Sequence, residues 1–152
     1  MATWNDVRRL ALALPQTKER FQHGSTGWAI RDKGFAWERH LRKSDLAALG
    51  AGAPKGAILA VRTDGLEMKE ALLARDAGVY FTTPHFDGYP AVLVRLGRIK
   101  VSELKDLLLE AWLSRAPERL AEAYLAACSE AAGSAKVRRR KRKTTRTART
   151  AR

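Results

Sequence analysis

A turn followed by an apolar run, within residues 82–96, is the feature that most constrains how this chain can fold. The segment Asp87-Gly88-Tyr89-Pro90 carries turn chemistry, because glycine tolerates positive φ and proline fixes φ on the way into the next segment. Residues 91–96 (AVLVRL) form a β-rich apolar run, which is typical of a strand with neighbours on both sides. The rest of the fold must therefore pair with this strand or cover it.

Hairpin patterns dominate the remaining chain. The turn Asp32-Lys33-Gly34 separates two arms with apolar residues at alternate positions, which predicts a hairpin with one buried and one wet face. The apolar positions of these arms are Trp28, Ile30, Phe35 and Trp37. Strands are predicted over residues 17–23, 28–31, 35–40, 57–62 and 79–81, and helices over 3–14, 43–49, 64–74, from 102 onward and from 117 to 133. This order predicts an α+β fold, an antiparallel sheet with helices packed on one face.

The glycine-rich segment over residues 50–56 is the most flexible internal piece. It lacks the Gly-Lys-Ser/Thr ending of a phosphate-binding P-loop. We therefore predict a surface loop there, and no nucleotide site of that type.

The net charge of +13 is unevenly distributed along the chain. Residues 136–152 contain ten Lys or Arg and no Asp or Glu, whereas residues 1–135 contain 19 basic and 16 acidic side chains. A run of like charges cannot bury a core and should be disordered when free. We therefore predict one folded domain over residues 1–133 and a disordered basic tail over residues 134–152.

Four sequence motifs occur in an order that resembles the MmcQ/YjbR family. They are T-W-x-x-V-x-x-L-A-L-A-L-P over residues 3–15, Gly34-Phe35-Ala36-Trp37, residues 84–94 (PHFDGYPAVLV) and Glu110-Ala111-Trp112. The resemblance covers roughly residues 3–125. It implies a small α+β fold and a DNA-binding role, because members of the family are commonly labelled DNA-binding, and it brings no established catalytic residues. The tail from Lys136 lies outside it.

Compartment signals favour the cytoplasm. No apolar run approaches the roughly 20 residues of a membrane span, and the N-terminus does not resemble a secretory signal. The lone Cys128 excludes an internal disulfide and suits a reducing compartment. We expect Cys128 to be a small buried residue on the inner face of the last helix.

Catalytic and metal chemistry find little support in the residue pattern. His23, His40 and His85 do not share a metal-ligand spacing, and a single Cys cannot build a thiolate site. His85 is the best candidate for a functional polar group, since Asp87 could orient its imidazole. The favoured alternative is that His85 caps or bonds a turn. We therefore expect a non-enzymatic protein with no cofactor and no metal.

The basic tail is the strongest functional signal in the sequence. It lacks aromatic residues for base stacking, which predicts sequence-independent contacts to phosphates. We expect a nucleoid-associated protein that binds DNA, with RNA as an alternative partner, acting as a monomer or weak dimer. The predicted nucleic-acid-binding residues are Lys136, Arg138, Arg139, Arg140, Lys141, Arg142, Lys143, Arg146, Arg149 and Arg152 in the tail, and Arg31, Lys33, Arg39, Arg42 and Arg95 in the domain.

Three other hypotheses stay open at this point. The domain could bind a protein or peptide through its sheet face or a Trp28/Trp37 surface, with the tail only localising it near nucleic acid. It could be an enzyme centred on His85, which would need a concave pocket and a second polar group. The tail could also serve only solubility.

Overall fold

The computed structural model describes residues 1–133. The chain separates into two units, Met1–Ala116 and Pro117–Arg152. The first unit contains the sheet and the helices α1 to α4, and the described part of the second is helical over residues 118–133. The predicted tail over residues 134–152 lies outside the described residues, so its disorder and the predicted boundary at residue 133 stay predictions.

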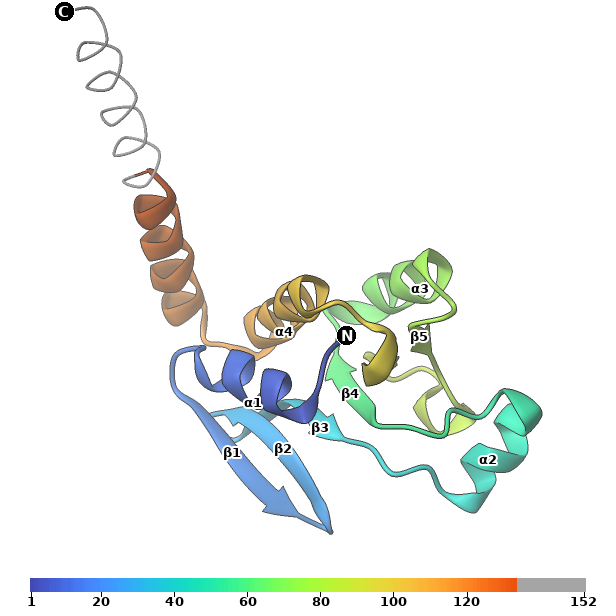
Figure 1. The fold of residues 1–152 in the computed structure, drawn as a ribbon. Helices are drawn as coiled ribbons and strands as arrows, with labels where there is room; N and C mark the ends of the chain where they lie inside the picture. Colours follow the sequence, from blue (N-terminus) through green and yellow to red (C-terminus); the bar gives the residue numbers. More distant parts are fainter. Residues whose placement is uncertain (134–152) are drawn as a thin grey trace, which may run out of the picture. The chain divides into compact units, whose positions relative to one another are not determined.

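The first unit is built on a six-stranded sheet in which every neighbouring pair is antiparallel (Figure 1). The strand order is β1-β2-β3-β4-β6-β5. The strands are β1 (Thr17–Gln22), β2 (Ser25–Ile30), β3 (Lys33–Glu38), β4 (Ile58–Arg62), β5 (Tyr80–Phe81) and β6 (Ala91–Arg95). The predicted apolar strand is β6, which lies between β4 and β5, so the predicted α+β fold with an antiparallel sheet is confirmed.

The helices α1 (Trp4–Leu12) and α4 (Val101–Arg115) pack against one face of the sheet. Thr3 caps α1, since its hydroxyl accepts the N–H of Asp6 while the Asp6 carboxylate accepts the N–H of Thr3. This reciprocal capping box satisfies two N–H groups that the first turn would otherwise leave without partners. The indole of Trp112 donates to the carbonyl of Pro15 over 3.1 Å, which joins α4 to the end of the α1 segment.

The main core lies between α4 and the sheet. The register pairs Leu59 with Val94 and Val61 with Val92, so these four side chains share one face. An apolar stripe of α4 is buried against this side of the sheet; its members are Leu104, Leu107, Leu108, Ala111 and Trp112. Burial of each large apolar side chain contributes roughly 1.5–3 kcal/mol, so this layer is the main source of stability.

A second cluster covers the opposite face of β4 and β6. Its buried members are Ile58, Ala60, Phe81, Phe86, Ala91 and Leu93. Trp37, Leu41 and Leu49 pack against it, and Leu49 belongs to α2 (Lys43–Leu49). The half of the sheet that contains β4 and β6 is thus covered on both faces. On β1 to β3, the face opposite α1 and α4 is not covered by any described helix.

The two hairpin turns lie one or two residues away from their predicted positions. The β1–β2 turn is His23-Gly24, where φ is +51° and +78°, and the β2–β3 turn is Arg31-Asp32, where Arg31 has φ +52°. Two-residue turns with positive φ match the twist of antiparallel arms. The register also shifts between Trp28 and Ala29, which places a bulge in this hairpin.

These shifts overturn the predicted Trp28/Trp37 surface. Trp28 pairs with Ala36 and Trp37 pairs with Gly27, so the two indoles lie on opposite faces of the sheet. Trp28 is 3% exposed and lines a hollow beside Trp4 and Arg8 of α1. The bulge is the physical reason, because it changes the alternation on which the prediction depended.

Leu66 of α3 (Gly65–Arg75) is 46% exposed, whereas Lys69 of the same helix is buried. Cys128 was expected to be buried, but it is exposed. Among the described residues the buried apolar core ends at Trp112, so the helix over residues 118–133 adds no buried apolar side chain. No helix among residues 1–133 is long and apolar enough to cross a membrane.

Candidate nucleic-acid interface

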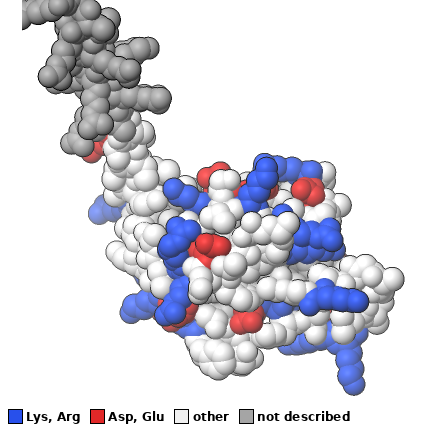
Figure 2. All heavy atoms as spheres, in the orientation of Figure 1, with Lys and Arg blue, Asp and Glu red and all other residues white. Residues whose placement is uncertain are grey.

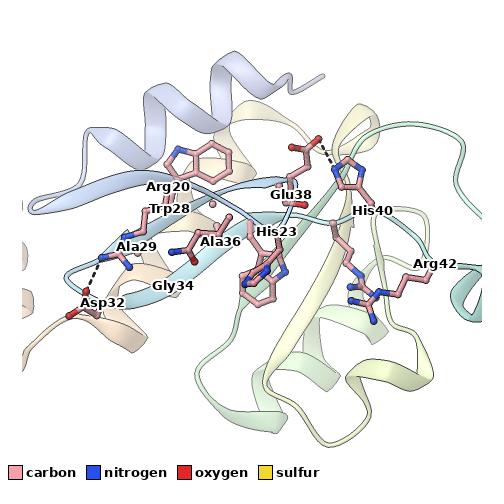
Figure 3. A pocket seen from close by; sticks show the side chains of 15 residues that line it. Arg20, His23, Trp28, Ala29, Asp32, Gly34, Ala36, Glu38, His40 and Arg42 are labelled. Carbon is pink, nitrogen blue, oxygen red and sulfur yellow. Dashed lines mark hydrogen bonds and ion pairs between the residues drawn. The ribbon is translucent and has the colours of Figure 1, made fainter.

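A hollow with a volume of about 390 Å³ lies on the open face of β1 to β3 (Figure 3). Its floor contains small residues, Gly27, Ala29 and Gly34. A Cβ atom at Gly27 would lie 3.3 Å from the Cβ of Trp37, which is tighter than most real contacts. The glycine therefore keeps the floor low beside the half-buried Trp37 indole.

Basic side chains stand around this hollow. Figure 3 shows Arg20 beside Asp32 at one end, Arg42 at the other end and His23 between them. The Arg20 guanidinium donates to Asp32 over 2.9 Å and to the carbonyl of Arg31 over 2.7 Å. The Asp32 side chain is 96% exposed, so this ion pair is worth little and leaves the Arg20 charge available to an anion.

Arg42 has no acidic partner among the described residues, although its backbone N–H donates to the Asp45 carboxylate over 2.9 Å. Its side chain is exposed at the start of α2. His40 also lines the hollow and lies 3.6 Å from Glu38. Guanidinium and imidazole groups beside an aromatic ring suit a phosphate with a neighbouring base.

Arg39 has a different environment from Arg42. Its side chain is 11% exposed and bonds the buried carboxylate of Asp45 over 2.9 Å. Its guanidinium also lies 5.1 Å from the ring centre of Phe86. Burial alone would raise the pKa of Asp45, but the Arg42 N–H, the Arg39 charge and the Thr83 hydroxyl together lower it. This pair joins the end of β3 to α2 and to the 84–90 segment.

The other predicted domain residues lie in two places. Arg31 and Lys33 are exposed around the β2–β3 turn, next to the hollow, and Arg31 donates to the side chain of Gln16 over 3.4 Å. Arg95 lies elsewhere, at the end of β6, where its guanidinium is 4.5 Å from the ring centre of Phe81. The structure therefore brings Arg39 and Arg42 to the hollow, with Arg31 and Lys33 beside it and Arg95 apart. The ten predicted tail residues, from Lys136 to Arg152, lie outside the described residues.

Sequence reasoning missed Arg20 and His23 as parts of this site. Both lie on or beside the β1–β2 hairpin, whose turn was predicted at residues 24–27. With the turn at His23-Gly24, Arg20 pairs with Gly27 and shares the face of Trp37. The His-Gly dipeptide was the signal that could have given this register.

His85 and Asp87 lie on the exposed part of the 84–90 segment. The His85 imidazole meets the Phe86 ring edge-on at 5.0 Å, and no hydrogen bond joins His85 to Asp87 among the described contacts. The buried ammonium of Lys69 instead holds this segment, donating to the carbonyls of Phe86 (2.5 Å) and Tyr89 (3.0 Å). Burial lowers the pKa of Lys69, and the negative charge of Asp87 partly opposes this. Within residues 1–133 there is no group of three His, Cys, Asp or Glu side chains that could hold a metal ion.

The fold and the hollow together define a class of protein: a small α+β domain whose antiparallel sheet carries α1 and α4 on one face and has an open, basic hollow on the other face of its hairpin half.

The chain belongs to the YjbR family, whose sequence model matches residues 12–114. This confirms the resemblance found in the sequence.

Proteins similar to this chain include the uncharacterised proteins Rv2570 of Mycobacterium tuberculosis and Mb2600 of Mycobacterium bovis. Each is 53% identical over 129 residues, covering 83% of this chain and 98% of the relative. The crystal structure of Deinococcus radiodurans protein DR2400, which has a DUF419 domain, matches with a TM-score of 0.56 and 20% identity. That match covers 74% of this chain and 78% of the other and supports the fold alone.

Proposed function

We propose that this protein binds DNA without catalysis, mainly through sequence-independent contacts between its basic C-terminal tail and phosphates. The observation that carries the proposal is the charge distribution, with ten basic and no acidic residues over 136–152 against 19 basic and 16 acidic residues over 1–135. Such a segment gains free energy by releasing the counterions condensed on a polyanion. Association with the nucleoid would follow from this affinity.

The folded domain supplies a weaker second contact in this proposal. Residues 16–43, which contain β1 to β3 and lead into α2, carry seven basic and three acidic side chains. On the face shown in Figure 2, by contrast, Lys and Arg side chains are interspersed with Asp and Glu and form no continuous basic patch. In this proposal the domain contacts DNA phosphates only locally, through Arg20 and Arg42 at the hollow, while the tail supplies most of the affinity.

The test compares three chains that differ in the tail. They are the full chain, residues 1–135, and a tail-neutral variant, defined as the full chain with all ten Lys and Arg of 136–152 changed to Gln. Binding of a labelled duplex is measured by anisotropy between about 50 and 200 mM salt. If about five phosphates are neutralised, log K for the full chain falls against log salt with a slope near −4.5.

Both altered chains should lose most of that slope, and circular dichroism checks that they remain folded. The same titration with RNA of equal length shows whether binding is confined to DNA. Equal affinity and slope in residues 1–135 and in the full chain would show that the tail mechanism is wrong. If none of the three chains binds DNA, the proposal is wrong, and a protein or peptide that docks on the open sheet face becomes the next candidate partner.

A further inference from the structure

A second hollow, with a volume of about 630 Å³, lies at the other end of the sheet from the β1–β2 hairpin turn. Three segments line it: the glycine-rich loop before β4, residues 77–78 before β5, and the end of β6 with the residues that follow. Two backbone bonds hold these segments together, Arg95 N–H to Val79 (2.8 Å) and Leu96 N–H to Ala57 (3.1 Å). These bonds tie the end of the glycine-rich loop and the residue before β5 to the end of β6 beside the hollow.

All charged side chains that line this hollow are basic: Lys55, Arg95 and Arg98. The nearby carboxylate of Asp76 accepts the backbone N–H of Gly78 over 2.9 Å and forms no ion pair with either arginine among the described contacts. Burial lowers the pKa of Arg95, and the neighbouring charge of Arg98 lowers it further. The two guanidiniums thus repel each other, and a bound anion would relieve that repulsion.

Arg95 is held in place before any ligand arrives. Its guanidinium donates to the carbonyl of Ala77 over 3.1 Å and lies on the ring of Phe81. The backbone around it is open, because a Cβ added at Gly52, Gly56 or Gly97 would meet no atom within 4 Å. An oxyanion can therefore approach both the main chain and the guanidiniums, although the loop lacks the P-loop pattern.

We infer that Lys55, Arg95 and Arg98 form a phosphate-binding site. The ligand class is a phosphate group, either a free phosphate or phosphomonoester, or a diester of a nucleic-acid strand. Guanidiniums match the paired oxygens of a phosphate, and a lysine adds a point charge. Lys55, Arg95 and Arg98 do not belong to the tail sequence and do not line the hollow on β1 to β3, so the inference does not depend on the proposed tail mechanism.

The test uses the tail-neutral variant, in which the tail cannot bind anions. Inorganic phosphate is titrated while the side-chain Nε–H signals of Arg95 and Arg98 are followed by NMR, with chloride at equal ionic strength as the reference. Saturable shifts with phosphate and not with chloride are expected. A parallel titration with unphosphorylated oligothymidylate tests the diester source, and saturation by either probe supports the site and identifies its ligand.

Two variants and one control make the result specific. Arg98→Gln combined with Lys55→Gln should weaken binding at least about tenfold, because two charged donors are lost. Gly97→Leu should weaken it by filling the hollow without removing charge. Lys105→Gln, which changes an exposed lysine of α4, should bind like the parent chain. Absence of saturation with both probes, or equal losses for Lys105→Gln and the double variant, would overturn the inference.

Discussion

Asp45 shows how one buried charge organises the region around the hollow. Its carboxylate is 2% exposed, bonds Arg39 and accepts the N–H of Arg42 at the start of α2. We expect Asp45→Asn to destabilise the protein by about 3 kcal/mol, because a buried guanidinium loses its counterion. Urea unfolding measures this, with Asp64→Asn as the control, since Asp64 is exposed and makes no side-chain cap.

The stability contributed by Asp45 should depend on pH in one direction. Its pKa is lowered in the folded protein, so its contribution is fully present above the unfolded pKa near 4 and is lost as pH falls through the folded pKa. The difference in free energy of unfolding between the parent chain and Asp45→Asn should therefore become smaller below about pH 4. A difference that stays constant from pH 7 to pH 3 would contradict the assigned ion pair.

Lys69 holds the segment that contains His85 and Asp87. We expect Lys69→Met to destabilise the chain by roughly 1–3 kcal/mol, because it removes two charge-assisted bonds to carbonyls. Amide exchange should accelerate at Tyr89, whose N–H bonds the Phe86 carbonyl that Lys69 also holds. Lys105→Met is the matched control, and normal exchange at Tyr89 in Lys69→Met would contradict this role.

Some of these residue environments could have been found in the sequence and some could not. Lys69 stands three and four residues before Leu72 and Leu73, so helical spacing alone places it on their face. Its partners could not be predicted, because the carbonyls of Phe86 and Tyr89 lie 17 and 20 residues away on a loop. The Arg39–Asp45 pair likewise depends on how α2 folds back beside the end of β3.

At the scale of elements, the existence of strands was easier to predict than their register. The apolar runs predicted the bounds of β4 and β6 to within one residue, because both faces of these strands are buried. The β1–β3 hairpins depend on two-residue turns and a bulge at Trp28, and a slip of one residue reverses the faces of a strand. The predicted register differed in this way from the observed one. It therefore placed Trp28 and Trp37 on the same face and did not place Arg20 beside Trp37.

The β1–β2 turn can be tested with two glycines of this hairpin region. Gly24 has φ +78°, whereas Gly34 lies in β3 with open space where a Cβ would be. Gly24→Ala should destabilise the chain by about 1–2 kcal/mol, because an L side chain is strained at positive φ. Gly34→Ala should have little effect or stabilise slightly. Equal unfolding midpoints for the two variants would contradict the turn at His23-Gly24.

At the scale of the whole molecule, sequence and structure contribute different parts of the proposal. The tail's charge is evident from composition alone, since it needs no tertiary contact. The two basic hollows could not be read from composition, because each collects side chains from segments far apart in the chain. Arg20 and Arg42, for example, meet one hollow only through the pairing of β1, β2 and β3.

A local phosphate contact at the first hollow can be separated from a general effect of charge. Arg42→Gln and Lys105→Gln each remove one exposed positive charge, but only Arg42 lines the hollow on β1 to β3. If a phosphate sits against Arg42, its loss should reduce the salt slope of DNA binding by about 0.9, and Lys105→Gln should leave the slope unchanged. Anisotropy titrations of the full chain measure both slopes. Equal slopes in the two variants would mean that Arg42 makes no phosphate contact at this hollow.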